Sequence, residues 1–306
     1  MLCAASSIFA QEPAKPEEDP VFRASVAQVR VDVQVLRDGK PVTGLTKDDF
    51  VVSDGGERRA ISYFGRDEEP LAVMLLLDVS GSMRRFLEQM AATAQRALGQ
   101  LGNQDRVGVA VFSKGTQTLL PLSRNIKEAA REIEVAVLDT KMPAGTAINA
   151  AVVEIAAQMK KDRTEQPQAS RRSILILTDN GSLNFQLTDE MVLRGLYGAD
   201  TVLNAIVVGE GNRRPRRASA NPDFTPADVF RLAEDSGGEA IRAERADRAF
   251  PDMIARMRIR YSLAYAAPPP QTPGEFRAIR VELTPEARRR LPNAQVRARR
   301  GYYAAE

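Results

Sequence analysis

The middle of the chain alternates between apolar runs of strand length and stretches with helical spacing. Four continuous apolar runs have the length of buried strands: 71–77, 107–112, 174–177 and 202–208. Helical spacing follows them in turn: after Ser82, then at 126–137, 146–159, 187–196, 230–233 and 246–259. Residues 118–122 predict an edge strand, and another short strand is expected near Ala240. This alternation predicts an α/β domain with a doubly wound, mostly parallel sheet.

Both ends of the chain instead show the two-residue alternation of half-buried strands. The alternating positions are Val29, Val31, Val33 and Val35, then 261–265, 279–283 and about 296–303. Apolar stretches at 50–52 and 60–64, with Asp54-Gly55-Gly56 between them, predict a hairpin. Because neither end has enough strands to bury a face, we predict that both build one small all-β sandwich into which the α/β domain is inserted.

This organisation divides the chain into five parts. They are a partial signal-peptide-like leader at 1–10, a linker at 11–20, sandwich segments at 21–68 and 259–306, and the α/β domain at 69–258. The first ten residues are apolar and end in Ala10, which is typical of the back half of a secretory leader without its basic start. A frayed terminus is the alternative. Proline mixed with acidic residues at 11–20 indicates a solvated linker.

Composition excludes several classes of function. The chain has no histidine, and its only cysteine is Cys3. Ser-His-Asp and Cys-His catalysis, zinc sites that need histidine and intrachain disulfides are therefore excluded. Its 43 Lys and Arg against 40 Asp and Glu leave a net charge of +3, too small to indicate nucleic-acid binding. No run after the leader reaches the roughly 18 apolar residues of a membrane span.

The candidate chemistry begins where the apolar run 71–77 ends. Asp78, Ser80 and Ser82 follow it at two-residue spacing, so in an extended chain their side chains point the same way. One carboxylate and two hydroxyls form a hard, weakly anionic oxygen site suited to Mg²⁺ or Mn²⁺. The spacing fits neither a calcium EF-hand nor a phosphate-binding P-loop. For this run alone, helix capping by Ser80 or Ser82 is the open alternative.

Two distant segments add to this group. A second apolar strand runs into Thr178-Asp179-Asn180-Gly181, and Gly145-Thr146 opens a helical pattern. Together with Asp78-x-Ser80-x-Ser82, these residues resemble the metal-ion-dependent adhesion site of the von Willebrand factor type A (VWA) family, over roughly residues 70–245. Asn180 stands where that family usually has glycine, and asparagine tolerates the same left-handed turn.

The resemblance implies a Rossmann-like VWA fold and a five-residue metal site. Its metal residues would be Asp78, Ser80, Ser82, Thr146 and Asp179. In a VWA-like strand order the sheet reverses between the strands that precede Asp78 and Asp179, where ligands of open α/β sheets collect. By family analogy, the two serines bind Mg²⁺ or Mn²⁺ directly and the other three bind directly or through water. A Glu or Asp carboxylate of a partner protein then completes the coordination.

The flanking strands resemble those of secreted bacterial VWA-related proteins. The expected function is therefore a secreted or periplasmic, non-enzymatic module for adhesion or assembly. One alternative is a cytosolic VWA subunit that works with an ATPase. Another is a metal-dependent phosphohydrolase with Asp78 as nucleophile, although Ser80 stands where the Asp-x-Asp motif of haloacid-dehalogenase-type enzymes needs its second Asp.

Loops on the metal face are expected to set specificity. They lie at 113–116, 141–144, 182–185 and 209–224, and the last contains Arg213-Arg214-Pro215-Arg216-Arg217. This basic loop is either a solvated loop or an arm that steers an acidic partner. Two further arginine-rich stretches, 288–290 and 297–300, are expected to face solvent.

Overall fold

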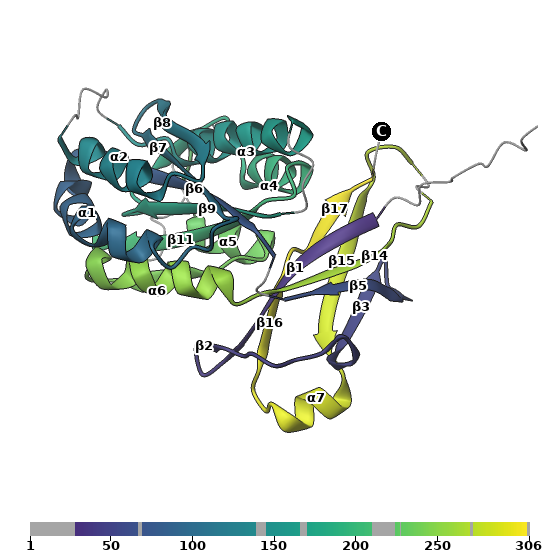
Figure 1. Ribbon diagram of the computed structural model, residues 1–306. Coiled ribbons are helices and arrows are strands. Elements are labelled where there is room, and N and C mark those ends of the chain that lie inside the picture. Colours follow the sequence, from purple (N-terminus) through teal and green to yellow (C-terminus); the bar gives the residue numbers. More distant parts are fainter. Residues whose placement is uncertain are drawn as a thin grey trace, which may run out of the picture.

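The computed structural model describes residues 28–66, 69–138, 145–165, 170–209, 224–226, 228–269 and 272–304. These residues form an α/β unit beside an antiparallel unit (Figure 1). The predicted leader at 1–10 and linker at 11–20 lie outside the described residues. Among the described residues, no helix combines the length and the apolar character needed to cross a membrane.

The α/β unit is built on a six-stranded sheet in the order β13-β11-β9-β6-β7-β8. The strands are β6 (Leu71–Asp78), β7 (Arg106–Phe112), β8 (Thr116–Ser123), β9 (Arg171–Thr178), β11 (Val202–Val208) and β13 (Ala240–Ala243). Only the edge strand β8 runs antiparallel to its neighbour; the other pairings are parallel. The doubly wound, mostly parallel fold predicted from the sequence is confirmed, and the strand order reverses between β6 and β9.

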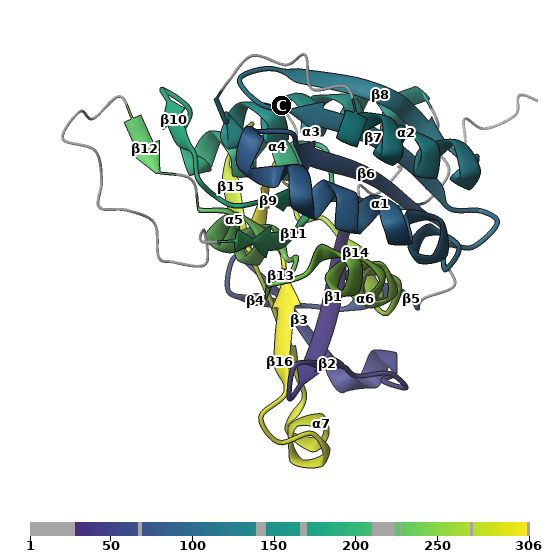
Figure 2. The ribbon, with the colours of Figure 1, turned by 90° about the vertical axis from the view of Figure 1, so that its left-hand side faces the viewer.

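Helices cover both faces of this sheet (Figure 2). One face packs against α1 (Arg84–Leu98), α2 (Ile126–Leu138) and α6 (Ala246–Arg258), and the other against α3 (Ile148–Glu165), α4 (Asp189–Gly198) and α5 (Val229–Ser236). Every residue of β6, β9 and β11 is buried. Parallel strands covered on both faces read as continuous apolar runs, which is why the sequence pattern located them.

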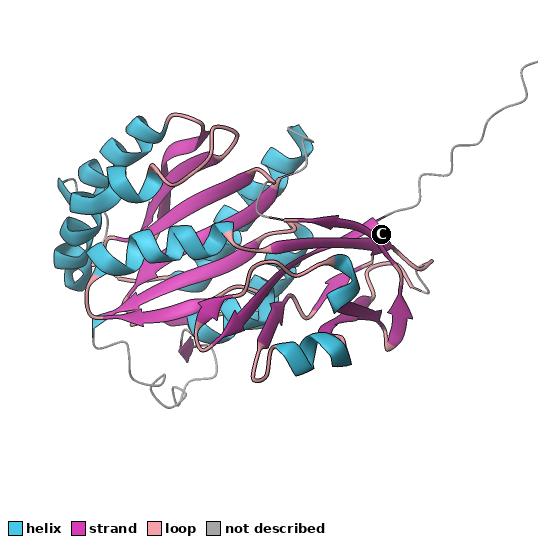
Figure 3. Cartoon of the chain, turned by 60° about the horizontal axis from the view of Figure 1, so that its bottom comes forward, coloured by secondary structure: helices cyan, strands magenta, loops and turns pink. Residues whose placement is uncertain are grey.

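The antiparallel unit is a sandwich made by both ends of the chain (Figure 3). One sheet has the order β16 (Gln295–Ala298), β1 (Gln28–Arg37), β14 (Tyr261–Ala266) and β5 (Ile61–Gly65), with β2 (Lys40–Pro41) paired to β1. The other has the order β17 (Gly301–Tyr303), β15 (Phe276–Leu283), β3 (Phe50–Asp54) and β4 (Glu57–Arg59). A short helix, α7 (Pro285–Arg290), follows β15. Strands from both ends share one core, so the α/β unit is inserted into the sandwich as predicted.

The predicted hairpin between 50–52 and 60–64 is wrong in its second strand. Across the Gly55-Gly56 turn, β3 pairs with β4, whereas β5 crosses to the other sheet and pairs with β14. Phe64 of β5 there packs against Tyr261, with ring centroids 5.9 Å apart. A contact between residues this far apart in the chain leaves no local sequence signal.

The expectation that residues 297–300 face solvent is also wrong in part. The Arg299 side chain is largely buried between the two units. It forms an ion pair with Asp200 at 3.0 Å and donates to the main-chain oxygen of Arg30. The arginines of α7 are exposed, as expected.

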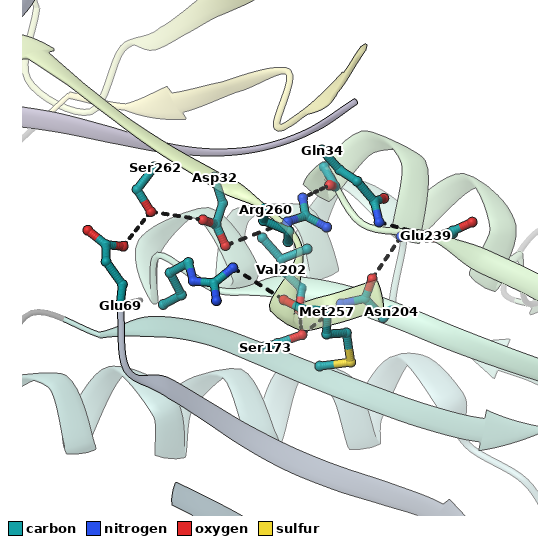
Figure 4. Close-up of polar contacts among 12 residues, drawn as sticks. Asp32, Gln34, Glu69, Ser173, Val202, Asn204, Glu239, Met257, Arg260 and Ser262 are labelled. Atoms are coloured by element: carbon teal, nitrogen blue, oxygen red, sulfur yellow. Dashed lines mark hydrogen bonds and ion pairs between the residues drawn. The ribbon is translucent and has the colours of Figure 1, made fainter. Parts of the chain in front are cut away.

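A layer of buried polar side chains joins the two units (Figure 4). Arg260, in the short link between α6 and β14, is only 4% exposed and lies 3.8 Å from the Asp32 carboxylate of β1. Burial lowers the pKa of Arg260, and the charge of Asp32 opposes that shift. The Ser262 hydroxyl of β14 lies within hydrogen-bond distance of the Asp32 and Glu69 carboxylates and has one proton to donate to them. An ion pair that is shielded from solvent therefore lies where the chain passes from the α/β unit into the sandwich.

Arg171 ties the other side of this layer to α6. It begins β9, is 2% exposed, and donates to the main-chain oxygens of Met257 and Arg258 at 3.2 and 3.1 Å. The last carbonyls of a helix lack partners within it and favour a positive charge. Arg171 therefore caps α6 just before the chain leaves the α/β unit.

A second line of hydrogen bonds crosses the junction (Figure 4). Gln34 of β1 donates to the Glu239 carboxylate, and the Glu239 main-chain N–H donates to Asn204 of β11. Asn204 in turn donates to Ser173 of β9 at 2.7 Å. The two units are thus connected through polar groups that are almost fully desolvated.

Candidate metal centre

Asp78 is the last residue of β6 and its carboxylate is fully buried. One oxygen accepts a hydrogen bond from the Ser80 main-chain N–H at 3.0 Å, and the other accepts one from the Thr178 hydroxyl at 2.7 Å. Burial raises the pKa of Asp78 to about 6, against the lowering effect of these two hydrogen bonds. A cation beside this carboxylate would offset the cost of its burial.

Ser80 and Ser82 lie in the turn that follows β6. Their hydroxyl oxygens are 3.4 Å apart, and Ser82 donates to the Asp179 carboxylate at 2.6 Å. Ser82 belongs to a 3₁₀ turn, η2 (Gly81–Met83), so the two serines meet through this turn and not through extended alternation. Ser80 precedes the turn, but its side chain makes no capping hydrogen bond, and α1 begins only after Met83. Helix capping therefore does not account for Ser80.

Asp179 follows β9, which lies beside β6 in the sheet. One carboxylate oxygen accepts from Ser82 and the other from the Gly181 main-chain N–H at 2.9 Å. A Cβ atom at Gly181 would lie 2.9 Å from that second oxygen, so any larger residue there would displace the Asp179 carboxylate from this position. The tight turn therefore presents the Asp179 carboxylate to Ser82.

Asn180 adopts the left-handed conformation expected for it, with φ of 57°. Its side-chain oxygen also accepts a hydrogen bond from the main-chain N–H of Val229, the first residue of α5, at 3.3 Å. A glycine, usual in the family, has no side chain to make this contact. The departure from the family pattern thus ties the Asp179 turn to the start of α5.

Thr146 lies two residues before α3 and is held there through its main chain. Ser182 donates to the Thr146 carbonyl at 2.6 Å and accepts from the Ile148 main-chain N–H at 3.4 Å. The main-chain N–H of Ala147, which lies between Thr146 and Ile148, donates to the carbonyl of Ser113 at 2.8 Å. Ser182 therefore connects the Thr146 segment to the turn that carries Asp179.

Two supporting residues were not predicted to act at the site. Thr178 is buried; its hydroxyl donates to Asp78 and accepts from the Asn180 main-chain N–H at 3.1 Å. Ser182 is also buried and bonds the Thr146 segment. Their sequence signal was that both carry hydroxyls close to Asp179, because such side chains form hydrogen bonds with nearby main-chain groups.

Ser182→Ala is expected to lower the free energy of unfolding by about 1–3 kcal/mol, because a buried carbonyl and a buried N–H lose their partner. Urea denaturation followed by circular dichroism measures this loss. The control is Ser80→Ala, whose hydroxyl is partly exposed and whose effect is expected to stay within about 0.5 kcal/mol. Equal losses in the two variants would contradict the role assigned to Ser182.

The donor set fits a hard divalent cation. The site offers only oxygen ligands, namely two carboxylates and three hydroxyls. They lie on the segments that follow β6 and β9 or precede α3. In the described part of the chain, this site included, His, Cys, Asp and Glu form no group of three or more able to hold a metal ion, so a cation here would need the hydroxyl oxygens as well as the two carboxylates. The carboxyl edge of β6 and β9 is therefore the candidate metal centre.

The expected specificity loop at 141–144 and most of the basic loop, 210–223, lie outside the described residues.

The comparisons with known proteins concern the fold. A family described as the von Willebrand factor type A domain matches residues 73–182. The BatB protein from Bacteroides thetaiotaomicron is 21% identical over 61% of this chain and 97% of its own, with a TM-score of 0.48. Proximal thread matrix protein 1 from the mussel byssus is described with a zinc-occupied metal-ion-dependent adhesion site (MIDAS) motif. It is 14% identical over 67% of this chain and 50% of its own, with a TM-score of 0.47.

A von Willebrand factor type A protein from Catenulispora acidiphila is similar over more of the chain. It is 12% identical over 93% of this chain and 75% of its own, with a TM-score of 0.46. No curated protein of similar sequence was found.

Proposed function

We propose that the chain, whose residues 73–182 match the von Willebrand factor type A domain family, is a secreted or periplasmic, non-enzymatic protein-binding module. It captures an acidic side chain of a partner protein through Mg²⁺ or Mn²⁺, in adhesion or in assembly. The residues that hold the metal are Asp78, Ser80, Ser82, Thr146 and Asp179.

The observation that carries this proposal is the 2.6 Å hydrogen bond between Ser82 and Asp179. These residues are 97 positions apart in the chain and come from the segments after two neighbouring strands. Thr178 links the same turn to Asp78. Oxygen groups from distant segments thus meet at the edge of an open sheet where ligands usually bind.

Each residue of the site has a distinct part in this proposal. The buried carboxylate of Asp78 supplies negative charge, and its hydrogen bonds from Ser80 and Thr178 fix its orientation. The hydroxyls of Ser80, Ser82 and Thr146 supply neutral oxygen, and Asp179 supplies a second carboxylate. When bound, the divalent cation supplies an electrophilic position that a carboxylate of the partner can fill, because few of its ligands are charged.

The test is partner capture from the native extracellular or periplasmic fraction, in Mg²⁺ and in EDTA. Proteins that the wild-type chain retains in Mg²⁺ are expected not to be retained in EDTA. The Asp78→Ala variant is expected not to retain them even in Mg²⁺. The control Asp48→Ala changes an exposed carboxylate of the sandwich and is expected to retain them. Capture that survives both EDTA and Asp78→Ala would reject the metal bridge.

A further inference from the structure

A short ribbon beside the candidate metal centre carries an exposed aromatic side chain. It consists of β10 (Leu183–Phe185) and β12 (Phe224–Pro226), which pair antiparallel and extend away from the rest of the α/β unit (Figure 2). Phe185 is 54% exposed although it is large and apolar. Met191, in the first turn of α4, is 49% exposed. The segment after the metal-site turn therefore presents two apolar side chains to solvent.

The base of the ribbon is bonded to the metal-site segments on both strands. Ser182, directly before β10, donates to the carbonyl of Thr146. On the other strand, the chain leaves β12 and enters α5 at Val229, whose N–H donates to Asn180. Asn184, within β10, is buried and accepts from the N–H of Asn149 at 3.1 Å. These contacts hold the first strand in place while Phe185 stays exposed.

The distance between the metal site and Phe185 is limited by chain geometry. Phe185 follows Asp179 by six residues, and six residues of extended chain span at most about 20 Å. An extended partner segment covers the same distance with about six residues. A partner with its carboxylate at the metal therefore reaches Phe185 with a side chain that lies within about six residues of that carboxylate.

Positive charge also adjoins the site. Lys114 is exposed and packs beside Gly145, its Cβ lying 3.6 Å from where a Cβ of that glycine would be. Arg85, which is exposed, lies in the first turn of α1 directly after the Ser82 turn, and Arg84 beside it forms an ion pair with Glu88. Together with a bound cation, these groups favour an anionic partner segment.

We propose that the β10–β12 ribbon is the second half of the partner-binding surface. The occupant is an extended segment of a partner protein that carries an Asp or Glu and, within about six residues of it, a large apolar side chain that packs on Phe185. This inference rests on the proposed function, because the acidic residue is placed by the metal.

The test starts from random 12-residue peptides displayed on phage and selected on the full chain in Mg²⁺, with elution by EDTA. The eluted peptides are expected to carry an acidic residue and to be enriched in large apolar residues within about six positions of it. Phe185→Ser is expected to weaken the selected peptides about tenfold or more, because it removes the apolar contact. Met191→Ser, at the exposed apolar position in the first turn of α4, is the second variant and is expected to weaken them less.

The matched control is Val135→Ser, a 42% exposed apolar residue on α2, which is expected to leave peptide affinity unchanged. The magnesium affinity of Phe185→Ser is also expected to be unchanged. EDTA-eluted peptides with an acidic residue but no apolar preference, or equal affinity for Phe185→Ser, overturn the ribbon surface and leave the metal bridge standing. A selection with no EDTA-eluted peptides, or peptides that bind Asp78→Ala equally well, overturns the proposed function itself.

Discussion

Mg²⁺ at a hundredfold excess over its dissociation constant is expected to raise the free energy of unfolding of the wild-type chain by about 2.7 kcal/mol. The proposed ligands Asp78, Thr146 and Asp179 come together only in the folded chain, so the ion binds that state and not the unfolded one. The Asp78 carboxylate is buried and its pKa is raised to about 6, so a nearby cation also relieves an electrostatic cost. Urea unfolding in Mg²⁺ and in EDTA, followed by circular dichroism, measures the increment.

Two variants connect this increment to the assigned residues. Asp78→Ala is expected to abolish it, because it removes the buried anionic ligand. Asp48→Ala, an exposed carboxylate in the sandwich, is expected to keep it in full. A magnesium increment of the same size in Asp78→Ala would show that the cation binds elsewhere and would contradict the proposed site.

The α/β unit was predictable because its strands are covered on both faces. Burial on both sides makes β6, the centre of β9 and most of β11 apolar, and amphipathic helices occupy the intervals between these strands. The sandwich was harder to predict in detail. The turn at Gly55-Gly56 correctly placed a hairpin, but nothing local shows that the next strand, β5, pairs with β14 about two hundred residues later.

The candidate site could be located from the sequence, but the contacts that hold it together could not. Spacing and family resemblance identified Asp78, Ser82 and Asp179, and the structure brings Ser82 and Asp179 into contact. The same reasoning treated Asn180 as a tolerated substitution, whereas its side chain bonds the start of α5. Such a contact depends on where a distant helix begins, which a motif does not specify.

Charged residues at the junction were the least predictable part of the fold. Arg171 and Arg260 sit at the ends of predicted elements, where a charged side chain normally marks the surface. Both are buried because the sandwich covers that end of the α/β unit. Only the three-dimensional arrangement of the two units places Asp32 and the end of α6 within their reach.

Arg171→Met is expected to lower the free energy of unfolding by about 3–5 kcal/mol, the range seen when one partner of a buried ionic network is removed. The substitution keeps an unbranched apolar stem but leaves the carbonyls of Met257 and Arg258 without their donor. It also removes a buried positive charge that interacts with the carboxylates of Asp32 and Glu69. Urea denaturation in EDTA, followed by circular dichroism, isolates this effect from metal binding.

Arg280→Met is the matched control, because Arg280 forms an exposed ion pair with Glu282 in the sandwich. Exposed pairs contribute roughly 0–1 kcal/mol, so this variant is expected to unfold close to the wild-type chain. Since Arg171 links β9 to the helix that leads into the sandwich, its loss is expected to destabilise both units together. A loss below about 1 kcal/mol in Arg171→Met would mean that the buried layer tolerates an apolar substitute, and that packing, not the ionic network, holds the two units together.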